Sequence, residues 1–218
     1  MAYERLKEAT PPKNPYVDKD RQFRFDVPFV TDWTMFVTQA EYMWKFSVLW
    51  NTFKPKSYLV IGALVGSSES YACWRTKHFP DLIVVADIDL SEYNPHQTNL
   101  ASVYKNISKN FPHELIIMKT NSQTSTSLRK HGPYDLVFVD GEHSEKGVQR
   151  DMDHAFLTLK EGGVIMVHDV DDLSNVKDGY NAWVGRHKHE IDQLVIPSSG
   201  SPSFQMGLGL IQKKKIKL

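Results

Sequence analysis

The sequence predicts an α/β protein built on a mostly parallel β-sheet. Short apolar, β-branched runs such as 136–139 and 164–167 contain no polar interruption, as expected for strands buried on both faces of a sheet. Between these two runs, apolar residues recur at helical spacing, which indicates a strand–helix–strand unit. With 218 residues and 41% hydrophobic content, the chain is long enough to bury one sizeable core.

We expect an N-terminal arm or lid over residues 1–30 and one domain over residues 31–218. The arm carries Pro11, Pro12, Pro15 and Pro28 among charged and aromatic residues and has no sustained periodicity. Its aromatic side chains either cover part of a pocket or pin the arm to the domain, and the second interpretation is the simpler one.

The first half of the domain is predicted to alternate helices and strands. The expected elements are a helix over 31–53, a strand and turn over 57–65, a strand over 82–86, a helix over 91–111 and a strand over 114–118. Ser67, Ser68 and Ser70 open a further helix after the turn. That helix contains Cys73, the one cysteine of the chain, so an intramolecular disulfide is excluded. We expect Cys73 to be a small buried hydrophobic residue rather than a nucleophile.

The second half continues the alternation. The expected elements are a strand over 136–139, a helix over 144–160, a strand over 164–167, a helix over 176–183 and strands over 191–196 and 206–211, with a turn over 198–203. We expect Gly162 and Gly163 to end the helix, because glycine readily adopts the positive φ common at helix C-termini. Lys213 to Lys215 are interpreted as a solubilising end.

Ionisable residues follow two of these strands. Asp140, Glu142 and His143 come after the strand over 136–139, and His168 and Asp169 come after the strand over 164–167. The carboxyl ends of parallel strands share one edge of the sheet, which is where ligands bind in open α/β sheets. Such residues are also ordinary in loops. The convergence of several ionisable groups favours a functional site.

A glycine turn and a distant acid point to a nucleoside-bearing cofactor. Gly62 and Gly66 allow close approach of a ligand, and the helix beginning at Ser67 offers free N–H groups. The turn lacks both the GxGxxG and the P-loop patterns, so alone it is a weak signal. Asp87 or Asp89, about 20 residues on, would accept hydrogen bonds from ribose hydroxyls, with the other acid capping a helix. Polar residues at 120–122 would lie beside the base.

Composition excludes several classes of function. The 26 basic and 26 acidic residues cancel, which argues against a protein that grips nucleic acid backbones. No apolar stretch approaches the roughly 20 residues needed to cross a bilayer, and the N-terminus is too polar for a signal peptide. We therefore expect a cytoplasmic protein without a membrane partner. Oligomeric state, a homo-oligomer included, is left open.

From about Thr38 to Lys213, the order of motifs resembles the class I S-adenosylmethionine (SAM)-dependent methyltransferases. The stretch VDGEHSEKGVQRDMDHAFLTLKEGGVIMVHDV is most similar to small-molecule O-methyltransferases of the "methyltransferase 24" type. The resemblance implies a Rossmann-like, seven-stranded, mostly parallel sheet with helices on both faces and an antiparallel last strand. It also implies that SAM lies across Gly62, Gly66, Ser67 and Asp87.

The resemblance extends to the reaction site. It implies that Asn121 and Ser122 lie near adenine and that Asp140 lies near the reactive methyl group. In metal-dependent relatives, residues matching Asp140, His168 and Asp169 hold Mg²⁺, and a histidine matching His143 is the base. The chemistry is consistent, because a divalent cation lowers the pKa of a bound hydroxyl and carboxylates suit a hard ion.

Three positions qualify these expectations. Val60 and Asn121 stand where the family usually carries an acid, so weakened cofactor binding or lost activity is an alternative. His168 is a softer ligand than a carboxylate, which would suit a manganese-like ion or a metal-free histidine base.

The leading hypothesis is SAM-dependent methylation of a hydroxyl on a small molecule or sugar. A catalytically degenerate SAM-binding or regulatory protein is the first alternative, although such a protein has no need of Asp140, His143 and Asp169. Nucleic-acid methylation is the second, and the absence of a [DN]PP[YF] motif after the fourth strand argues against it. The sequence does not identify the methyl acceptor.

Overall fold

The computed structural model describes residues 40–63, 66–88, 100–108, 111, 113–171, 173–197 and 207–215. Several expectations fall outside these ranges: the N-terminal arm over 1–30, the start of the first helix over 31–39, Asp89 and the turn over 198–203.

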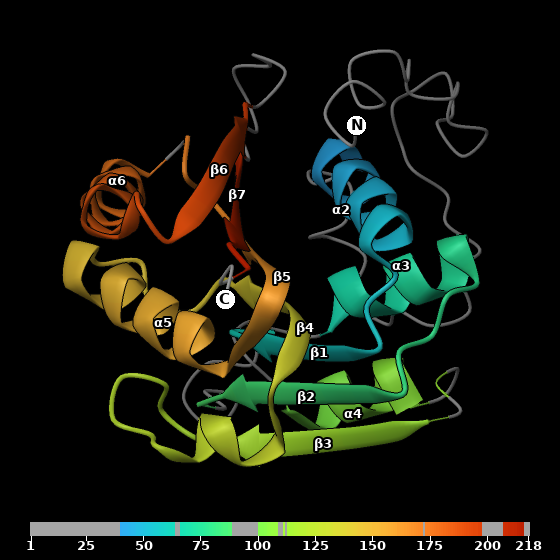
Figure 1. The fold of residues 1–218 in the computed structure, drawn as a ribbon. Helices are drawn as coiled ribbons and strands as arrows, with labels where there is room; N and C mark the ends of the chain where they lie inside the picture. The colour runs from blue at the N-terminus through green and yellow to red at the C-terminus, as the bar shows by residue number, and fades with distance from the viewer. Residues whose placement is uncertain are drawn as a thin grey trace, which may run out of the picture.

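The described strands form one seven-stranded sheet in the order β3-β2-β1-β4-β5-β7-β6 (Figure 1). The strands are β1 (Ser57–Ile61), β2 (Leu82–Asp87), β3 (Glu114–Lys119), β4 (Tyr134–Val139), β5 (Leu159–Val167), β6 (Ile191–Ile196) and β7 (Leu208–Lys213). Strands β1 to β5 pair in parallel, and β7 runs antiparallel to both β5 and β6. The predicted mostly parallel sheet with an antiparallel last strand is confirmed.

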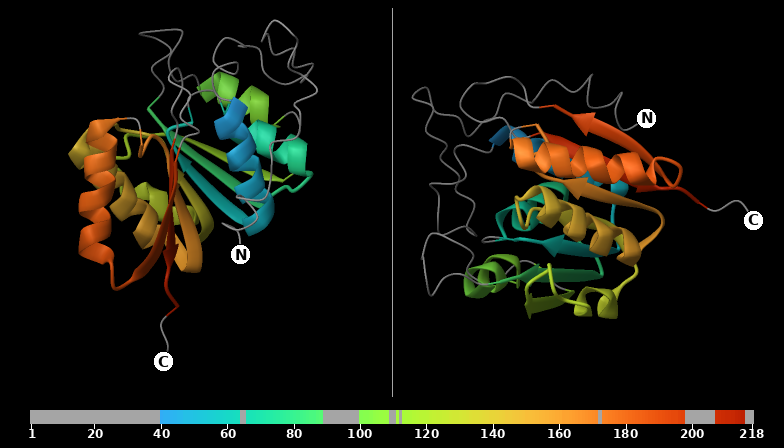
Figure 2. Two further views of the ribbon diagram at one scale, coloured as in Figure 1. Left: turned by 90° about the horizontal axis from the view of Figure 1, so that it is seen from above. Right: turned by 90° about the vertical axis from the view of Figure 1, so that its left-hand side faces the viewer.

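Helices cover both faces of this sheet, as predicted (Figure 2). On one face lie α2 (Ala40–Phe53), α3 (Ser67–Thr76) and α4 (Leu100–Ser108), and on the other lie α5 (Glu145–Thr158) and α6 (Ser174–His187); a 3-10 helix, η1 (Ser127–His131), precedes β4. No helix among the described residues is long and apolar enough to cross a membrane.

The strand side chains divide between two hydrophobic clusters because successive residues point to opposite faces of a sheet. On β1, Tyr58 and Val60 belong to the cluster that includes residues of α2 and α3. Leu59 and Ile61 belong to the cluster that includes residues of α5 and α6. All four side chains are at most 1% exposed, which explains the uninterrupted apolar strand sequences.

The predicted end of α5 at Gly162 and Gly163 is wrong. Ser144 caps the start of α5, where its Oγ accepts a hydrogen bond from the Gly147 N–H. The helix ends at Thr158, and β5 begins at once with Leu159. Both glycines therefore lie inside β5, where the pairing with β4 shifts register and Gly162 adopts a φ of 77°. The positive φ therefore belongs to an irregular part of the strand pairing and not to a helix cap.

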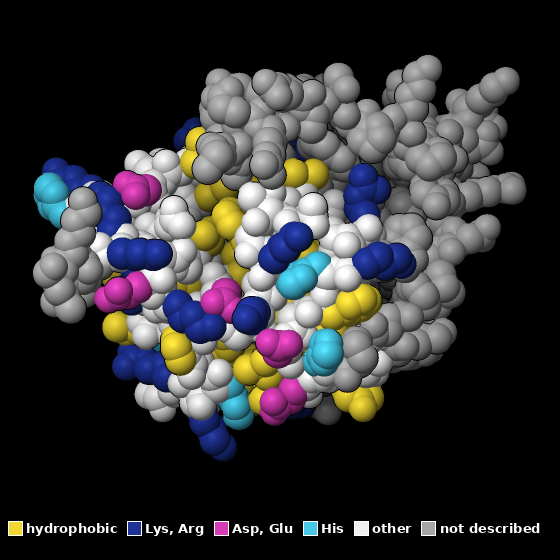
Figure 3. All heavy atoms as spheres, turned by 45° about the vertical axis from the view of Figure 1, so that its right-hand side comes forward, with side chains coloured by type: hydrophobic (Ala, Val, Ile, Leu, Met, Phe, Trp, Pro, Cys, Tyr) yellow, Lys and Arg dark blue, Asp and Glu magenta, His cyan; other side chains and the backbone are white. Residues whose placement is uncertain are grey.

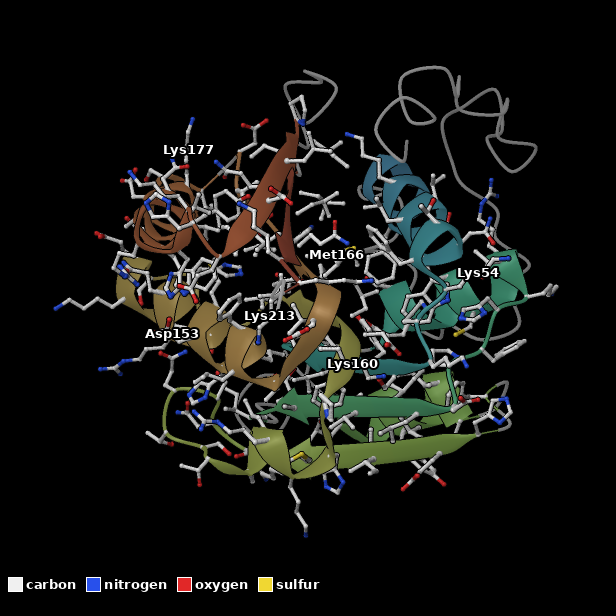
Figure 4. All side chains as sticks on the ribbon, in the orientation of Figure 1. Lys54, Asp153, Lys160, Met166, Lys177 and Lys213 are labelled. Atoms are coloured by element: carbon white, nitrogen blue, oxygen red, sulfur yellow. The ribbon has the colours of Figure 1, made fainter. Side chains whose placement is uncertain are left out.

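Lys213 makes structural contacts and is therefore not only a solubilising residue. It lies on β7, and its Nζ donates hydrogen bonds to the carbonyls of Phe156 and Leu159 at 3.1 and 3.3 Å (Figure 4). The ammonium also lies 4.5 Å from the centroid of the Phe156 ring. A cation at the C-terminal end of α5 is favourable, because unpaired carbonyls carry partial negative charge there.

Asp135 ties three strands together at the edge opposite the site. Its Oδ2 accepts hydrogen bonds from the backbone N–H groups of Lys56 and Ser57, and its Oδ1 accepts one from Lys160 Nζ at 2.8 Å (Figure 4). Burial opposes the charge, but the hydrogen bond from Lys160 and those from Ser57 and Lys56 hold the pKa of Asp135 below its ordinary value.

Asp135→Ala is expected to lower the free energy of unfolding by about 2 kcal/mol near neutral pH. A depressed pKa in the folded state contributes stability above the ordinary carboxyl pKa and loses it as the pH falls through the folded value. The difference from wild type, measured by urea unfolding at about pH 7 and about pH 3, should therefore shrink in acid. Asp192→Ala is a matched control, because Asp192 is 71% exposed in its ion pair with Lys214. Equal losses at both pH values would contradict the prediction.

Candidate active site

The predicted site residues gather at the carboxyl edge of the parallel strands. Backbone hydrogen bonds continue between neighbouring strands beyond their ends, from the Gly62 N–H to the Ala86 carbonyl at 3.0 Å and from the Asp140 N–H to the Ile61 carbonyl at 2.8 Å. The His168 N–H likewise donates to the Val139 carbonyl. The loops after β1, β2, β4 and β5 therefore share one rigid frame, which confirms the predicted convergence.

The glycine turn after β1 is a tight one. Gly62 and Gly66 have φ values of 82° and 71°, which lie in the region that favours glycine. A Cβ at Gly62 would lie 2.1 Å from the Asp140 carbonyl oxygen, so the chain after β4 lies directly against this turn. Gly66 precedes α3, and Ser67 is its first residue. The start of a helix is a favourable position for an anionic group of a ligand.

Asp87 braces the glycine turn from β2. Its Oδ2 accepts a hydrogen bond from the Ala63 N–H at 2.6 Å, and its Oδ1 accepts one from the Ile88 N–H at 2.7 Å. The side chain is buried. These two hydrogen bonds fix the carboxylate at the end of β2, next to the glycine turn.

The loop after β3 is held from below by a buried carboxylate. Asn121, which is exposed, accepts a hydrogen bond from the Gln123 N–H on its own Oδ1. Gln123 Nε2 donates to Asp151 Oδ1 at 2.7 Å, and Asp151 Oδ2 accepts from the Glu142 N–H at 3.2 Å. Asp151 is fully buried, and burial raises its pKa to about 6, against a hydrogen bond from Ser122. Asp151 thus joins the loops after β3 and β4.

Sequence reasoning missed Asp151, although a signal was present. It stands between Val148, Met152 and Ala155, on the stripe of α5 that faces the sheet. A charged residue within the buried stripe of an amphipathic helix requires polar partners. Glu142 was expected to join the acidic cluster, but it is exposed and its Oε1 accepts a hydrogen bond from the Ser144 N–H.

Two carboxylates lie between two histidines at the centre of the site. His168 Nδ1 is 3.1 Å from Asp140 Oδ1 and 3.3 Å from Asp169 Oδ1. His143 Nε2 is 3.5 Å from Asp140 Oδ1 and 3.7 Å from Asp169 Oδ2. The side chain of His168 is 6% exposed and that of His143 is 48% exposed. His168 therefore closes the buried side of the cluster, and His143 stands on its open side.

The cluster is strongly polarised. Burial opposes the charge on Asp140, but His168 and His143 hold its pKa at about 2. Burial also opposes protonation of His168, yet the carboxylates of Asp140 and Asp169 raise its pKa to about 10. The hydrogen bond with Asp140 raises the pKa of His143, against the effect of burial. Two carboxylates facing one space favour a positive group between them.

The donor set fits a divalent cation. Asp140, His143 and Asp169 each offer one ligand atom, and these atoms lie within 4.8 Å of one another. Carboxylate oxygens suit Mg²⁺, and an added imidazole nitrogen suits a softer ion such as Mn²⁺. Asp169 has a φ of 59°, which is uncommon for a residue with a side chain. The chain after β5 accepts this conformation with the Asp169 carboxylate directed at the cluster.

Comparisons with known proteins agree with this architecture. A family model described as a methyltransferase domain (Methyltransf_24) matches residues 52–170, more than half of the chain. No curated protein matches the sequence.

Three solved structures illustrate the fold. An O-methyltransferase from Bacillus cereus in complex with S-adenosylhomocysteine (SAH) is 15% identical, with a TM-score of 0.61 over 79% of this chain and 81% of that chain. A putative O-methyltransferase from Klebsiella pneumoniae is 15% identical, with a TM-score of 0.61 over 97% and 96%. The N-methyltransferase NodS from Bradyrhizobium japonicum WM9, in complex with SAH, is 12% identical, with a TM-score of 0.60 over 82% and 88%.

The family match begins in α2 and ends at Val170, so it contains the glycine turn, Asp87 and the whole acid–histidine cluster. The sheet order and the antiparallel β7 are shared with this fold. The chain belongs to the class I SAM-dependent methyltransferases, in the family of this methyltransferase domain.

Proposed function

We propose that this enzyme transfers the methyl group of SAM to a hydroxyl oxygen of a small molecule or sugar, with a divalent metal held at the acid–histidine cluster. The observation that carries the proposal is the meeting of Asp140, His143 and Asp169 beside the glycine turn. A methyl acceptor bound there would lie next to the cofactor, as in-line transfer to oxygen requires.

The cofactor is proposed to lie along the edge formed by the loops after β1, β2 and β3. The turn from Gly62 to Gly66 and the N–H groups beginning at Ser67 would hold the amino acid end. Asp87 would accept hydrogen bonds from the ribose hydroxyls, which its position at the end of β2 beside the glycine turn supports. Asn121 and Ser122 would lie near the adenine.

The metal is proposed to bind between Asp140 and Asp169. When bound, a divalent cation would lower the pKa of an acceptor hydroxyl. His168 Nδ1 lies against both carboxylates and would complete the ligand set, so that His143 Nε2 would serve as the base. From the buried side of the cluster, His168 would also hold the two carboxylates in a fixed orientation. His143, on the open side, would take the hydroxyl proton at Nε2, and its raised pKa makes its neutral form a stronger base.

Calorimetric titration with SAM and SAH tests this proposal, first with Mg²⁺ and then with a chelator. Micromolar binding, about 8 kcal/mol, is expected for the cofactor in both conditions. Methyl transfer in a screen of phenolic and sugar hydroxyls should then require the metal. Absence of cofactor binding in both conditions would overturn the proposal, and full transfer activity in chelator would overturn the metal assignment.

A degenerate SAM-binding protein is the second candidate, favoured by Val60, which is fully buried where the family usually carries an acid. Cofactor binding without transfer to any acceptor would support it. Nucleic-acid methylation is less well supported: in Figure 3, basic, acidic and histidine side chains are interspersed over the displayed face, without a continuous basic patch.

A further inference from the structure

A buried carboxyl group stands in the first helical turn after the glycine turn, and the proposed function does not use it. Glu69 stands in the first turn of α3, three residues after Gly66, and is 1% exposed. Its Oε1 accepts a hydrogen bond from Tyr58 Oη at 2.8 Å. Among the described residues, Tyr58 is the one side-chain hydrogen-bond partner of Glu69, and no Lys, Arg or His forms an ion pair with it.

Three observations relate this carboxyl group to the proposed cofactor site. Tyr58 and Val60 point to the same face of β1, the face covered by α3. The start of α3 follows directly from the glycine turn. Asp140, at the end of the neighbouring β4, is close enough for its charge to act on Glu69. Glu69 therefore lies in the first helical turn after the glycine turn, on the face of β1 that α3 covers.

A positive partner would stabilise a carboxylate in this position. Removing a carboxylate from water is costly unless a cation compensates. Burial raises the pKa of Glu69 to about 7, against the hydrogen bond from Tyr58, and Asp140 adds to the rise. The group is thus poised between its neutral and ionised forms in the absence of a cation. SAM and SAH both carry an α-ammonium group on their amino acid end.

We propose that Glu69 binds the α-ammonium group of the cofactor. The assignment rests on the proposed cofactor site and extends it to a residue on α3. It also accounts for Val60, since the helix would supply the carboxylate that the strand lacks, on the same face of β1. The alternative is that Glu69 only anchors the Tyr58 hydroxyl, and the ligand pair below distinguishes the two roles.

The test compares SAH with the SAH analogue that lacks only the α-amino group. Wild type is expected to bind SAH on the order of 10- to 100-fold more tightly than this analogue, as removal of a charged hydrogen bond requires. Glu69→Gln keeps the shape of the side chain and an acceptor for Tyr58. It should bind SAH as weakly as wild type binds the analogue, and it should bind the analogue as wild type does. Calorimetry supplies the four dissociation constants, and thermal unfolding checks the fold.

Tyr58→Phe is the matched control, because it removes the hydroxyl and leaves the carboxylate. It should retain most of the preference for SAH. If the Tyr58–Glu69 hydrogen bond has only a structural role, Tyr58→Phe and Glu69→Gln should instead weaken the binding of SAH and of the analogue equally. Should Glu69→Gln not fold, equal affinity of wild type for the two ligands would still overturn the assignment. Failure of wild type to bind SAH at all would overturn the proposed cofactor site together with it.

Discussion

His143→Ala is expected to lower kcat by about 100- to 10,000-fold while the dissociation constant of SAM changes by less than about threefold. The histidine stands on the open side of the cluster, with its Nε2 within 3.7 Å of both carboxylates. None of its described contacts reaches the glycine turn or Asp87. The substitution should therefore remove the proton acceptor and leave the proposed cofactor contacts in place. Steady-state kinetics, together with calorimetric titration of SAM, measure the two effects.

The metal dependence of this variant separates two roles for His143. If His143 is the base, added metal will not restore the activity of His143→Ala. A lost ligand would weaken metal binding, so that activity would return as the Mg²⁺ or Mn²⁺ concentration rises. His189→Ala removes an exposed histidine in the turn after α6 and should leave kcat unchanged. Wild-type activity in His143→Ala would exclude both roles.

Gly62→Ala is expected to have the largest effect on stability, a loss of about 4 kcal/mol of unfolding free energy. The added Cβ would lie 2.1 Å from the Asp140 carbonyl oxygen, an approach that only a backbone shift can relieve. The φ of 82° adds strain for any residue with a side chain. Because the shift would move the loop that carries Asp140, cofactor binding and methyl transfer should be lost with the stability.

Gly185→Ala provides the matched control. Gly185 lies within α6, and a Cβ there would meet no atom within 4 Å. Alanine in an unobstructed helical position should raise the unfolding free energy by up to about 1 kcal/mol. Urea unfolding of both variants gives the comparison. A Gly62→Ala protein as stable as wild type would show that the turn tolerates displacement, contrary to the contact with Asp140.

Much of the sheet could be predicted because its signals are local. The run from Ile191 to Ile196 forms a strand with the predicted bounds, and the predictions for β1, β2 and β3 differ from the structure by one residue or by the turn that follows. The junction of α5 and β5 could not be predicted in this way. Its position depends on the pairing of β5 with β4 and on the register shift in that pairing, which local sequence signals do not report.

In the candidate site, too, the features with local sequence signals could be predicted, and those that depend on contacts between distant segments could not. Asp140 and Asp169 follow apolar strands, so their convergence could be predicted from topology alone. The burial of Glu69 against Tyr58 could not, because Tyr58 belongs to another element. The apolar stripe of α5 signals the burial of Asp151, but its partner Gln123 also lies on another element and could not be predicted. For the same reason, the sequence did not distinguish the exposed His143 from the buried His168.

Asp151 has a consequence for the order in which ligands enter and leave. It holds the loop beside the proposed adenine site through Gln123 and the acceptor-side loop through the Glu142 N–H. Two loops anchored on one buried group are expected to open together. The acceptor side is then complete only while the cofactor loop is in place. In kinetic terms, this predicts a sequential ordered scheme, in which SAM binds before the acceptor and SAH is the last product to dissociate.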